Sequence, residues 1–164
     1  MQASEGIRPF EQSDFEAVDR IRAMAFKPIF ASFRQLVGDE IAPIAIAKDE
    51  TGQADYLKGI CAPEATMEIY VYERDSEIVG FCALSLDREN LIGEIDLNAV
   101  HPDHQGQGVA SALYAFAFER MREAGMKVAT VGTGADESHA PARRAYERCG
   151  FDRSIPGVHY YRRL

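Results

Sequence analysis

Cysteine is scarce in this sequence and forms no pattern. It occurs at three unrelated positions, Cys61, Cys82 and Cys149. An odd number of cysteines at irregular spacing indicates neither a disulfide framework nor a zinc motif. The scattered histidines His101, His104 and His159 also lack the spacing of metal ligands. We therefore expect no metal site, and a reducing, cytoplasmic location fits best.

Long apolar runs are missing as well. The longest, at 41–47 and 109–118, are interrupted by proline or by small and polar residues well short of a membrane span. The first fifteen residues lack a basic start followed by an apolar stretch, so we expect no secretion signal and no membrane partner. The 164 residues, 46% of them hydrophobic, are enough for one core. A single domain over 1–164 is expected.

A surplus of basic residues is also absent. The chain has 18 Lys and Arg against 26 Asp and Glu, a formal charge of -8. Binding to nucleic acid generally requires Lys and Arg in excess on one face, so no nucleic-acid partner is expected. The charge is more compatible with a cationic partner.

The first part of the chain predicts one strand and then helices. A strand is expected at 5–10, and Ser13 is expected to cap the helix that follows. A second helix is expected after Pro28, ending at Gly38. The stretch from residue 40 to 63 remains untyped and leaves room for another helix.

The rest of the chain alternates between strand and helix patterns. Two strands are expected to form a hairpin, and a third precedes an amphipathic helix that Gly125 closes. A further strand, a helix and a final hairpin follow, and that hairpin is expected to turn at Pro156-Gly157. The predicted ranges are 67–74, 77–86, 92–100, 109–125, 126–132, 141–150 and 151–164. This order predicts an α/β protein with a mixed, mostly antiparallel sheet rather than a regular doubly wound one.

A glycine-containing stretch, 105–111, lies between a predicted strand and the first turn of a helix. Two glycines with intervening backbone N–H groups form a concave anion site, and the helix dipole adds partial positive charge. A diphosphate fits such a site, and a plain tight turn is the alternative. A Walker A loop is excluded because no lysine follows Gly108. A dinucleotide fingerprint is excluded because Ser111 replaces its third glycine and antiparallel strands come first.

The sequence resembles the GNAT superfamily of N-acetyltransferases. The family's pyrophosphate pattern Q/R-x-x-G-x-G/A is matched by Gln105, Gly108 and Ala110. Its later A-x-x-x-Y-x-x-x-G-F segment is matched by Ala142, Tyr146, Gly150 and Phe151. The order of expected elements also agrees over almost the whole chain. The resemblance implies a GNAT-like acyl-CoA N-acyltransferase fold, with a splayed central sheet flanked by helices and acetyl-CoA as cosubstrate.

The resemblance also implies which residues bind acetyl-CoA. Backbone groups of one strand would bind the pantetheine arm, namely those of Asn98, Ala99 and Val100. The loop and helix start would hold the pyrophosphate through Gln105, Gly106, Gln107, Gly108, Val109, Ala110 and Ser111. His139 stands where many relatives carry an asparagine that contacts pantetheine. It either replaces that contact or caps the helix.

Acetyl transfer to an amine requires a base, an oxyanion site and a proton donor. By resemblance, the Tyr146 phenol protonates the thiolate, and its alternative role is packing. Glu94 is the candidate base, and Asp96 or a water chain could take this role instead. Glu94 could also be an ordinary surface carboxylate without a catalytic role. Strand alternation predicts Asp96 and Asn98 on the face of Glu94. The backbone N–H of Val100 is the candidate oxyanion donor.

These residues predict an N-acetyltransferase that moves an acetyl group from acetyl-CoA to a primary amine by direct attack in a ternary complex. The acceptor is expected to be a small molecule or a peptide. A non-catalytic acyl-CoA sensor and a transferase for longer acyl groups remain alternatives. Phe26, Phe30 and Phe33 either line the acceptor pocket or pack in the core. A homodimer through the late strands is a further expectation.

Overall fold

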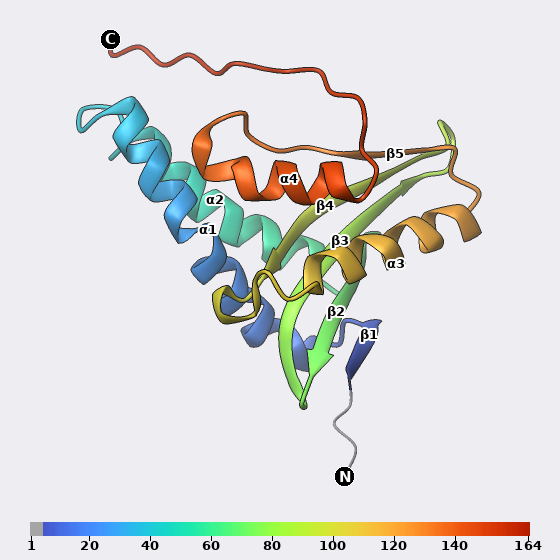
Figure 1. Cartoon of the computed structure of the whole chain (residues 1–164). Helices are drawn as coiled ribbons and strands as arrows, with labels where there is room; N and C mark the ends of the chain where they lie inside the picture. The colour runs from blue at the N-terminus through green and yellow to red at the C-terminus, as the bar shows by residue number, and fades with distance from the viewer. Residues whose placement is uncertain (1–4) are drawn as a thin grey trace.

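The computed structural model describes residues 5–164. The prediction that the chain has no secretion signal concerns its first fifteen residues, and the first four of these lie outside the described part. The described chain contains a five-stranded sheet in the order β1-β2-β3-β4-β5 (Figure 1). Neighbouring strands from β1 to β4 pair antiparallel, and β5 pairs parallel to β4. The strands are β1 (Glu5–Pro9), β2 (Glu68–Arg74), β3 (Glu77–Asp87), β4 (Ile92–Val100) and β5 (Val128–Val131). The predicted mixed, mostly antiparallel sheet is therefore confirmed.

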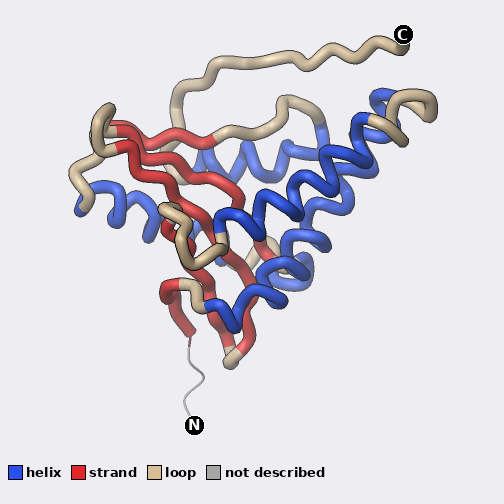
Figure 2. Tube along the Cα trace, turned by 180° about the vertical axis from the view of Figure 1, so that it is seen from behind, coloured by secondary structure: helices blue, strands red, loops and turns tan. Residues whose placement is uncertain are grey.

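Two pairs of helices cover the two faces of the sheet (Figures 1 and 2). The helices are α1 (Phe15–Val37), α2 (Ala45–Ile60), α3 (Val109–Glu123) and α4 (Ala140–Arg148). Side chains of α1 and α2 form one core with the strand residues Val71 and Phe81. Side chains of α3 and α4 form a second core with Cys82 and Ile95 on the opposite face. Residues of β2, β3 and β4 thus contribute alternately to the two cores.

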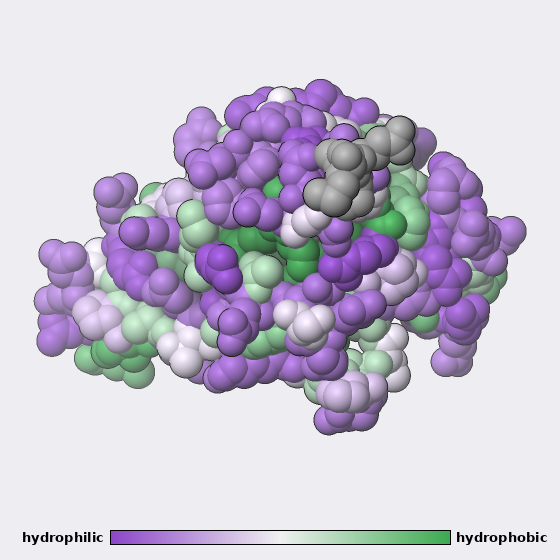
Figure 3. All heavy atoms as spheres, turned by 90° about the horizontal axis from the view of Figure 1, so that it is seen from below, coloured by the Kyte–Doolittle hydropathy of each residue, from purple (hydrophilic) through white to green (hydrophobic). Residues whose placement is uncertain are grey.

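Three short 3-10 turns complete the described chain: η1 (Gln12–Asp14), η2 (Pro102–His104) and η3 (Glu137–His139). No helix within residues 5–164 combines the length and hydropathy needed to cross a bilayer. Seen from below, hydrophilic residues cover most of the surface, and hydrophobic atoms are visible in a recess between them (Figure 3).

The first helix is longer than predicted. Pro28 was expected to separate two helices, but it lies inside α1, which runs unbroken to Val37. An internal proline costs about 3 kcal/mol in lost hydrogen bonding and steric strain. Here Ile21 before it and Phe30 after it are both buried, so packing holds the two halves in one helix. Ser13 belongs to η1 rather than capping α1, and Asp14 occupies the N-cap position.

The predicted hairpin at the C-terminal end is wrong. Residues 151–164 form neither strand nor helix, and Figure 1 shows them as an extended segment passing above α4. Ile155 is 98% exposed and Val158 is 78% exposed. A two-stranded hairpin is marginally stable unless one face packs against something else. No such packing covers these side chains, so the alternating pattern alone does not produce strands.

Candidate functional site

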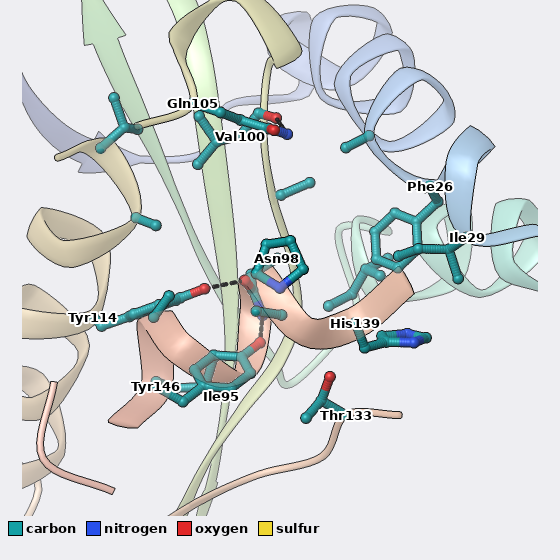
Figure 4. Close-up of a pocket in the computed structure, with 18 of the residues that line it drawn as sticks. Phe26, Ile29, Ile95, Asn98, Val100, Gln105, Tyr114, Thr133, His139 and Tyr146 are labelled. Atoms are coloured by element: carbon teal, nitrogen blue, oxygen red, sulfur yellow. Dashed lines mark hydrogen bonds between the residues drawn. The ribbon is translucent and has the colours of Figure 1, made fainter. Parts of the chain in front are cut away.

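The site is a cleft where β4 and β5 separate. The two strands pair only from Ile92 to Ile95 on β4, and β4 then continues to Val100 without β5 beside it. A cavity of about 1150 Å³ opens there. Its walls come from α1, β4, the loop before α3, and α4 (Figure 4). Backbone groups at the free edge of β4 are therefore available to a ligand.

The predicted pyrophosphate loop forms one wall of this cavity. Gly106 and Gly108 have φ angles of 72° and 84°, in the left-handed region that glycine tolerates best. Gly108 is the N-cap of α3 and no side chain caps that end, so the first backbone N–H groups are free for an anion. The predicted residues that line the cavity here are Gln105, Gly106, Gly108, Val109, Ala110 and Ser111.

Gln107 is the predicted loop residue that the structure leaves out of the cavity lining. Its side-chain nitrogen donates to the carbonyl of Asp103 at 2.9 Å, and its side-chain oxygen accepts from Arg74 at 2.9 Å. Gln105 lines the cavity, and its side-chain nitrogen donates to the carbonyl of Val100 at 3.1 Å. That bond ties the loop to the end of β4.

A β-bulge in β4 overturns the predicted alternation. Asn98 pairs with Cys82 and Ile95 pairs with Leu84, so β4 has one more residue than β3 between these pairs. Glu94 and Asp96 consequently share the α1/α2 side of the sheet, whereas the side chain of Asn98 faces α3 and α4. The expectation that Asn98 lies on the face of Glu94 is therefore wrong, because one extra residue reverses the alternation.

On the α3/α4 side, Asn98 connects two buried tyrosines (Figure 4). The Tyr114 hydroxyl donates to Asn98 Oδ1 at 2.7 Å, and Asn98 Nδ2 donates to the Tyr146 hydroxyl at 3.2 Å. Tyr146 is 7% exposed, and its burial raises the pKa of its phenol, while contacts with Asn98 and Tyr114 act in the opposite direction. Tyr146 is therefore a neutral phenol at physiological pH. Its ring centroid lies 5.2 Å from that of Tyr114.

On the α1/α2 side, the cavity carries two carboxylates. Glu94 and Asp96 both line it, beside Tyr56 of α2. The Tyr56 hydroxyl lies 3.0 Å from each carboxylate oxygen of Asp96. Burial, followed by this hydrogen bond, raises the pKa of Tyr56 to about 12. The predicted rivals Glu94 and Asp96 thus occupy the same part of the site in different surroundings.

His139 lines the cavity beside an aspartate. Its Nδ1 lies 2.7 Å from Asp136 Oδ1, and its ring centroid is 5.6 Å from that of Phe33. His139 stands at the N-cap position of α4, but its side chain makes no capping hydrogen bond. The helix-cap alternative is therefore wrong, and the ring is instead held between Asp136 and α1.

The three early phenylalanines divide between the two predicted roles. Phe26 lines the cavity, and Figure 4 shows it beside Ile29. Phe30 is buried in a small core with Ala42 and Ile46. Phe33 packs against that core and faces the His139 ring.

Sequence reasoning missed two arginines of the cavity wall. Arg144 and Arg148 both line the cavity from α4 and are exposed. Residues four apart lie on one face of a helix, so their spacing on the predicted helix was a usable signal. Tyr114 and the side-chain role of Asn98 were also missed, because they depend on packing between distant segments.

The cysteines sit in the interior rather than in the cavity wall. Burial raises the pKa of Cys61 to about 11 and that of Cys82 to about 12, so both are neutral thiols. Cys149 packs beside the α3/α4 core. Within residues 5–164 no three His, Cys, Asp or Glu side chains are grouped so as to hold a metal ion.

Comparison with known families agrees with this geometry. The profile of the "Acetyltransferase (GNAT) family" matches residues 34–151, well over half of the chain. The chain belongs to this family. The matched range of this GNAT protein contains the β4 cleft, the glycine loop and α4, and ends at Phe151.

Named relatives match the GNAT protein over about half of its length. It is 33% identical over 82 residues to mycothiol acetyltransferase of Streptomyces coelicolor, covering 50% of this chain and 26% of that one. It is 35% identical over 91 residues to the enzyme of that name from Sanguibacter keddieii, covering 52% and 28%. The chain thus spans about a quarter of the length of these relatives.

Solved structures share the fold over nearly the whole chain. Aminoglycoside N-acetyltransferase AAC(6')-Iy in complex with CoA has a TM-score of 0.63 at 13% identity, covering 100% of this chain and 98% of that one. PaiA N-acetyltransferase from Thermoplasma acidophilum in complex with coenzyme A has a TM-score of 0.65 at 14% identity, covering 88% of each. At these identities the likeness concerns the fold alone.

Proposed function

We propose that this GNAT protein is an N-acetyltransferase that moves an acetyl group from acetyl-CoA to a primary amine within a ternary complex. One observation carries the proposal. A single cavity joins a helix N-terminus with free N–H groups, a buried neutral tyrosine and two carboxylates on the far side of a strand. Together they would bind the anionic cosubstrate and supply the proton donor and the base of the transfer.

The binding of acetyl-CoA follows from the donors along one side of the cavity. The pyrophosphate is bound by backbone N–H groups at Gly106, Gly108 and the start of α3, which need no positively charged surface. The pantetheine arm pairs with the free edge of β4, at Asn98, Ala99 and Val100. Arg144 and Arg148 add positive charge beside the phosphates, and His139 contacts the arm from the opposite wall.

The transfer uses two side chains on opposite faces of β4. Glu94 accepts a proton from the substrate ammonium, directly or through water, and the neutral amine attacks the thioester carbonyl carbon. The backbone N–H of Val100 stabilises the resulting oxyanion. When the carbon–sulfur bond breaks, the thiolate takes the phenolic proton of Tyr146. The proton that the attached nitrogen still carries in excess then passes through water to the Tyr146 phenolate, and Glu94 releases its proton to solvent. The products are the acetylated amine and CoA with a free thiol.

The charges of the cavity wall favour a cationic, partly apolar acceptor. Glu94 and Asp96 lie on the α1/α2 side, where Met24, Phe26 and Ile29 supply an apolar wall. The cationic residues of the cavity, Arg144 and Arg148, lie on α4. The α4 side of the cavity therefore suits the anionic cosubstrate. The α1/α2 side suits an acceptor that carries an ammonium group next to an apolar group.

The deciding experiment measures free thiol released from acetyl-CoA in the presence of a panel of amines. Turnover with at least one amine supports the enzyme. Binding of CoA in calorimetry without turnover for any amine would support the alternative of an acyl-CoA sensor. Comparing acetyl-CoA with propionyl-CoA and butyryl-CoA tests the alternative of a longer acyl group.

The remaining proposals concern organisation. We propose that residues 1–164 form one domain in the cytoplasm and that two copies associate through the C-terminal segment. The exposed apolar side chains of Ile155, Val158 and Tyr160 support association, and Arg153, Arg162 and Arg163 outnumber Asp152 on this segment of an acidic chain. Light scattering of the protein and of an Ile155→Asp, Val158→Asp variant tests it. A wild-type monomer at all concentrations would disprove association.

A further inference from the structure

The Asn98 side chain lies between two buried tyrosines, and only one of its orientations satisfies its neighbours. Asn98 Nδ2 is 2.9 Å from the backbone carbonyl of Asp96, which can only accept a hydrogen bond. The amide nitrogen must therefore face that carbonyl. The same orientation places Oδ1 within 2.7 Å of the Tyr114 hydroxyl. A flipped amide would leave two acceptors facing each other.

This orientation gives the two tyrosines different roles. Tyr114 donates its proton to Asn98 Oδ1, so that proton is already in use. Tyr146 instead accepts the second hydrogen of Asn98 Nδ2 at 3.2 Å. Among the hydrogen bonds of residues 5–164, none uses the Tyr146 hydroxyl as a donor. The proton of Tyr146 is thus free to leave toward the cavity.

The same hydrogen bond helps Tyr146 after the proton has left. A phenolate in a buried site is costly unless a donor satisfies it. The amide hydrogen of Asn98 already points at the phenolic oxygen, so no rearrangement is needed. The titratable groups facing Tyr146 are Tyr114 from α3 and Cys82 from β3, and burial raises the pKa of each. Both stay neutral. Tyr114 acts in the same direction as Asn98 on the pKa of Tyr146, and Asn98 is the group that donates to the phenolic oxygen at 3.2 Å.

We propose that Asn98 is a positioning residue, which selects Tyr146 rather than Tyr114 as the proton donor and stabilises the phenolate that remains. The β-bulge makes this possible, since it turns the side chain of Asn98 toward α3 and α4. This inference rests on the proposed acetyl transfer for its consequence in catalysis. The bond between Asn98 and Tyr146 can also be tested without turnover.

The first test uses the isosteric variant Asn98→Asp. A carboxylate cannot donate, so the Tyr146 hydroxyl must donate to it and its proton is no longer free. We expect kcat with acetyl-CoA to fall about 100-fold, the size of a general-acid contribution, while the Kd of CoA changes less than about threefold. The matched control is Asn90→Asp, because Asn90 is exposed in the turn between β3 and β4 and lies outside the cavity lining. Its kcat should stay within about twofold of wild type.

A double-mutant cycle separates positioning from a merely structural role. In the Tyr146→Phe background, Asn98→Asp should lower kcat no further, since its effect acts through the Tyr146 hydroxyl. The proposal would be overturned if the kcat of the double variant fell by the product of the two single losses. It would also be overturned if Asn98→Asp weakened CoA binding as much as it lowered kcat. A melting temperature for each variant shows that the comparison is made between folded proteins.

The second test needs no substrate. Ultraviolet titration of tyrosine ionisation, taken as the difference between a protein and its Tyr146→Phe version, isolates Tyr146. Asn98→Ala should raise the apparent pKa of Tyr146 by about 1, because the phenolate loses one hydrogen bond. An unchanged titration overturns the role of Asn98 even if the enzyme is active. Absence of turnover with every amine would instead refute the proposed function and leave this result standing.

Discussion

The phenolic oxygen of Tyr56 lies 3.0 Å from both carboxylate oxygens of Asp96, which joins α2 to the bulge of β4. Asp96 Oδ1 also accepts the backbone N–H of Leu97 at 2.6 Å. Both oxygens of Asp96 are therefore engaged. The Glu94 carboxylate accepts no comparable hydrogen bond within residues 5–164, although it lines the same cavity. This difference favours Glu94 as the group that accepts a proton from the amine.

Substitution of the two carboxylates tests that assignment. Glu94→Gln keeps the size of the side chain but cannot accept the proton, so we expect kcat/KM to fall about 100-fold. Asp96→Asn should cost about tenfold or less, since its role is to orient Tyr56 and to attract the cation. Steady-state kinetics with the best acceptor measures both. A larger loss of kcat/KM for Asp96→Asn than for Glu94→Gln would identify Asp96, rather than Glu94, as the base.

Removal of the Tyr146 hydroxyl tests the proton donor. Tyr146→Phe should lower kcat about 100-fold and leave the Kd of CoA nearly unchanged, because the ring and its packing remain. Tyr114→Phe should cost less, since the Tyr114 proton is held by Asn98. Stopped-flow or steady-state assays of CoA release give both values. A greater loss for Tyr114→Phe would identify Tyr114 as the donor.

The pH dependence of kcat follows from the raised pKa of Tyr146. The donor must be protonated, and a raised pKa extends the protonated form to higher pH. We therefore expect kcat to show no loss from Tyr146 ionisation until above about pH 10, the ordinary value for tyrosine. A fall in kcat well below that pH, absent in Tyr146→Phe, would contradict the burial of this phenol.

Two glycines at opposite ends of α3 form a matched pair. Gly108 at the N-terminus and Gly125 after the C-terminus have φ angles of 84° and 82°, so alanine strains either position by about 1–2 kcal/mol. Only Gly108 lines the cavity. Gly108→Ala should raise the Kd of CoA several-fold, whereas Gly125→Ala should lower the melting temperature alone. Equal CoA affinity in the two variants would place the pyrophosphate elsewhere.

The α4 arginines should contribute long-range attraction to CoA. Arg144→Ala and Arg148→Ala are each expected to weaken CoA binding about three- to tenfold at low salt, and less at high salt because exposed charges are screened. Arg162→Ala is the control, since Arg162 is exposed on the C-terminal segment and does not line the cavity. Calorimetry at two ionic strengths measures the effect. A loss of affinity that does not depend on salt would disprove this explanation.

The ion pair of Arg8 and Asp14 should stabilise the start of α1. Two hydrogen bonds of 2.7 and 3.0 Å join them, and the bond from Arg8 lowers the pKa of Asp14. Asp14→Asn should lower the free energy of unfolding by about 2 kcal/mol at pH 7. A lowered pKa stabilises the fold above the unfolded value of about 3.9, and this contribution is lost as the pH falls below it. Urea unfolding at pH 7 and pH 3 should therefore show a smaller difference at pH 3.

Much of the fold could be predicted because local patterns specify it. The alternation in β2 and β3 and the apolar positions of α3 report burial directly, and Gly125 ends α3 as expected. The two helices expected around Pro28 proved to be one, because tertiary packing on Ile21 and Phe30 outweighs the local cost of proline. The C-terminal hairpin failed for the opposite reason, since its apolar alternation has no partner to pack against.

The amino-acid sequence by itself determined the order of the elements from β2 to α4 and the glycine loop at the start of α3, because local patterns and neighbouring residues set the backbone conformation there. Only the tertiary structure decided which side chains meet in the cavity. One extra residue in β4 sends Glu94 and Asp96 toward α2 but Asn98 toward Tyr146. That outcome depends on the pairing register of two strands, which is set by both strands together and by the cores on either side of the sheet.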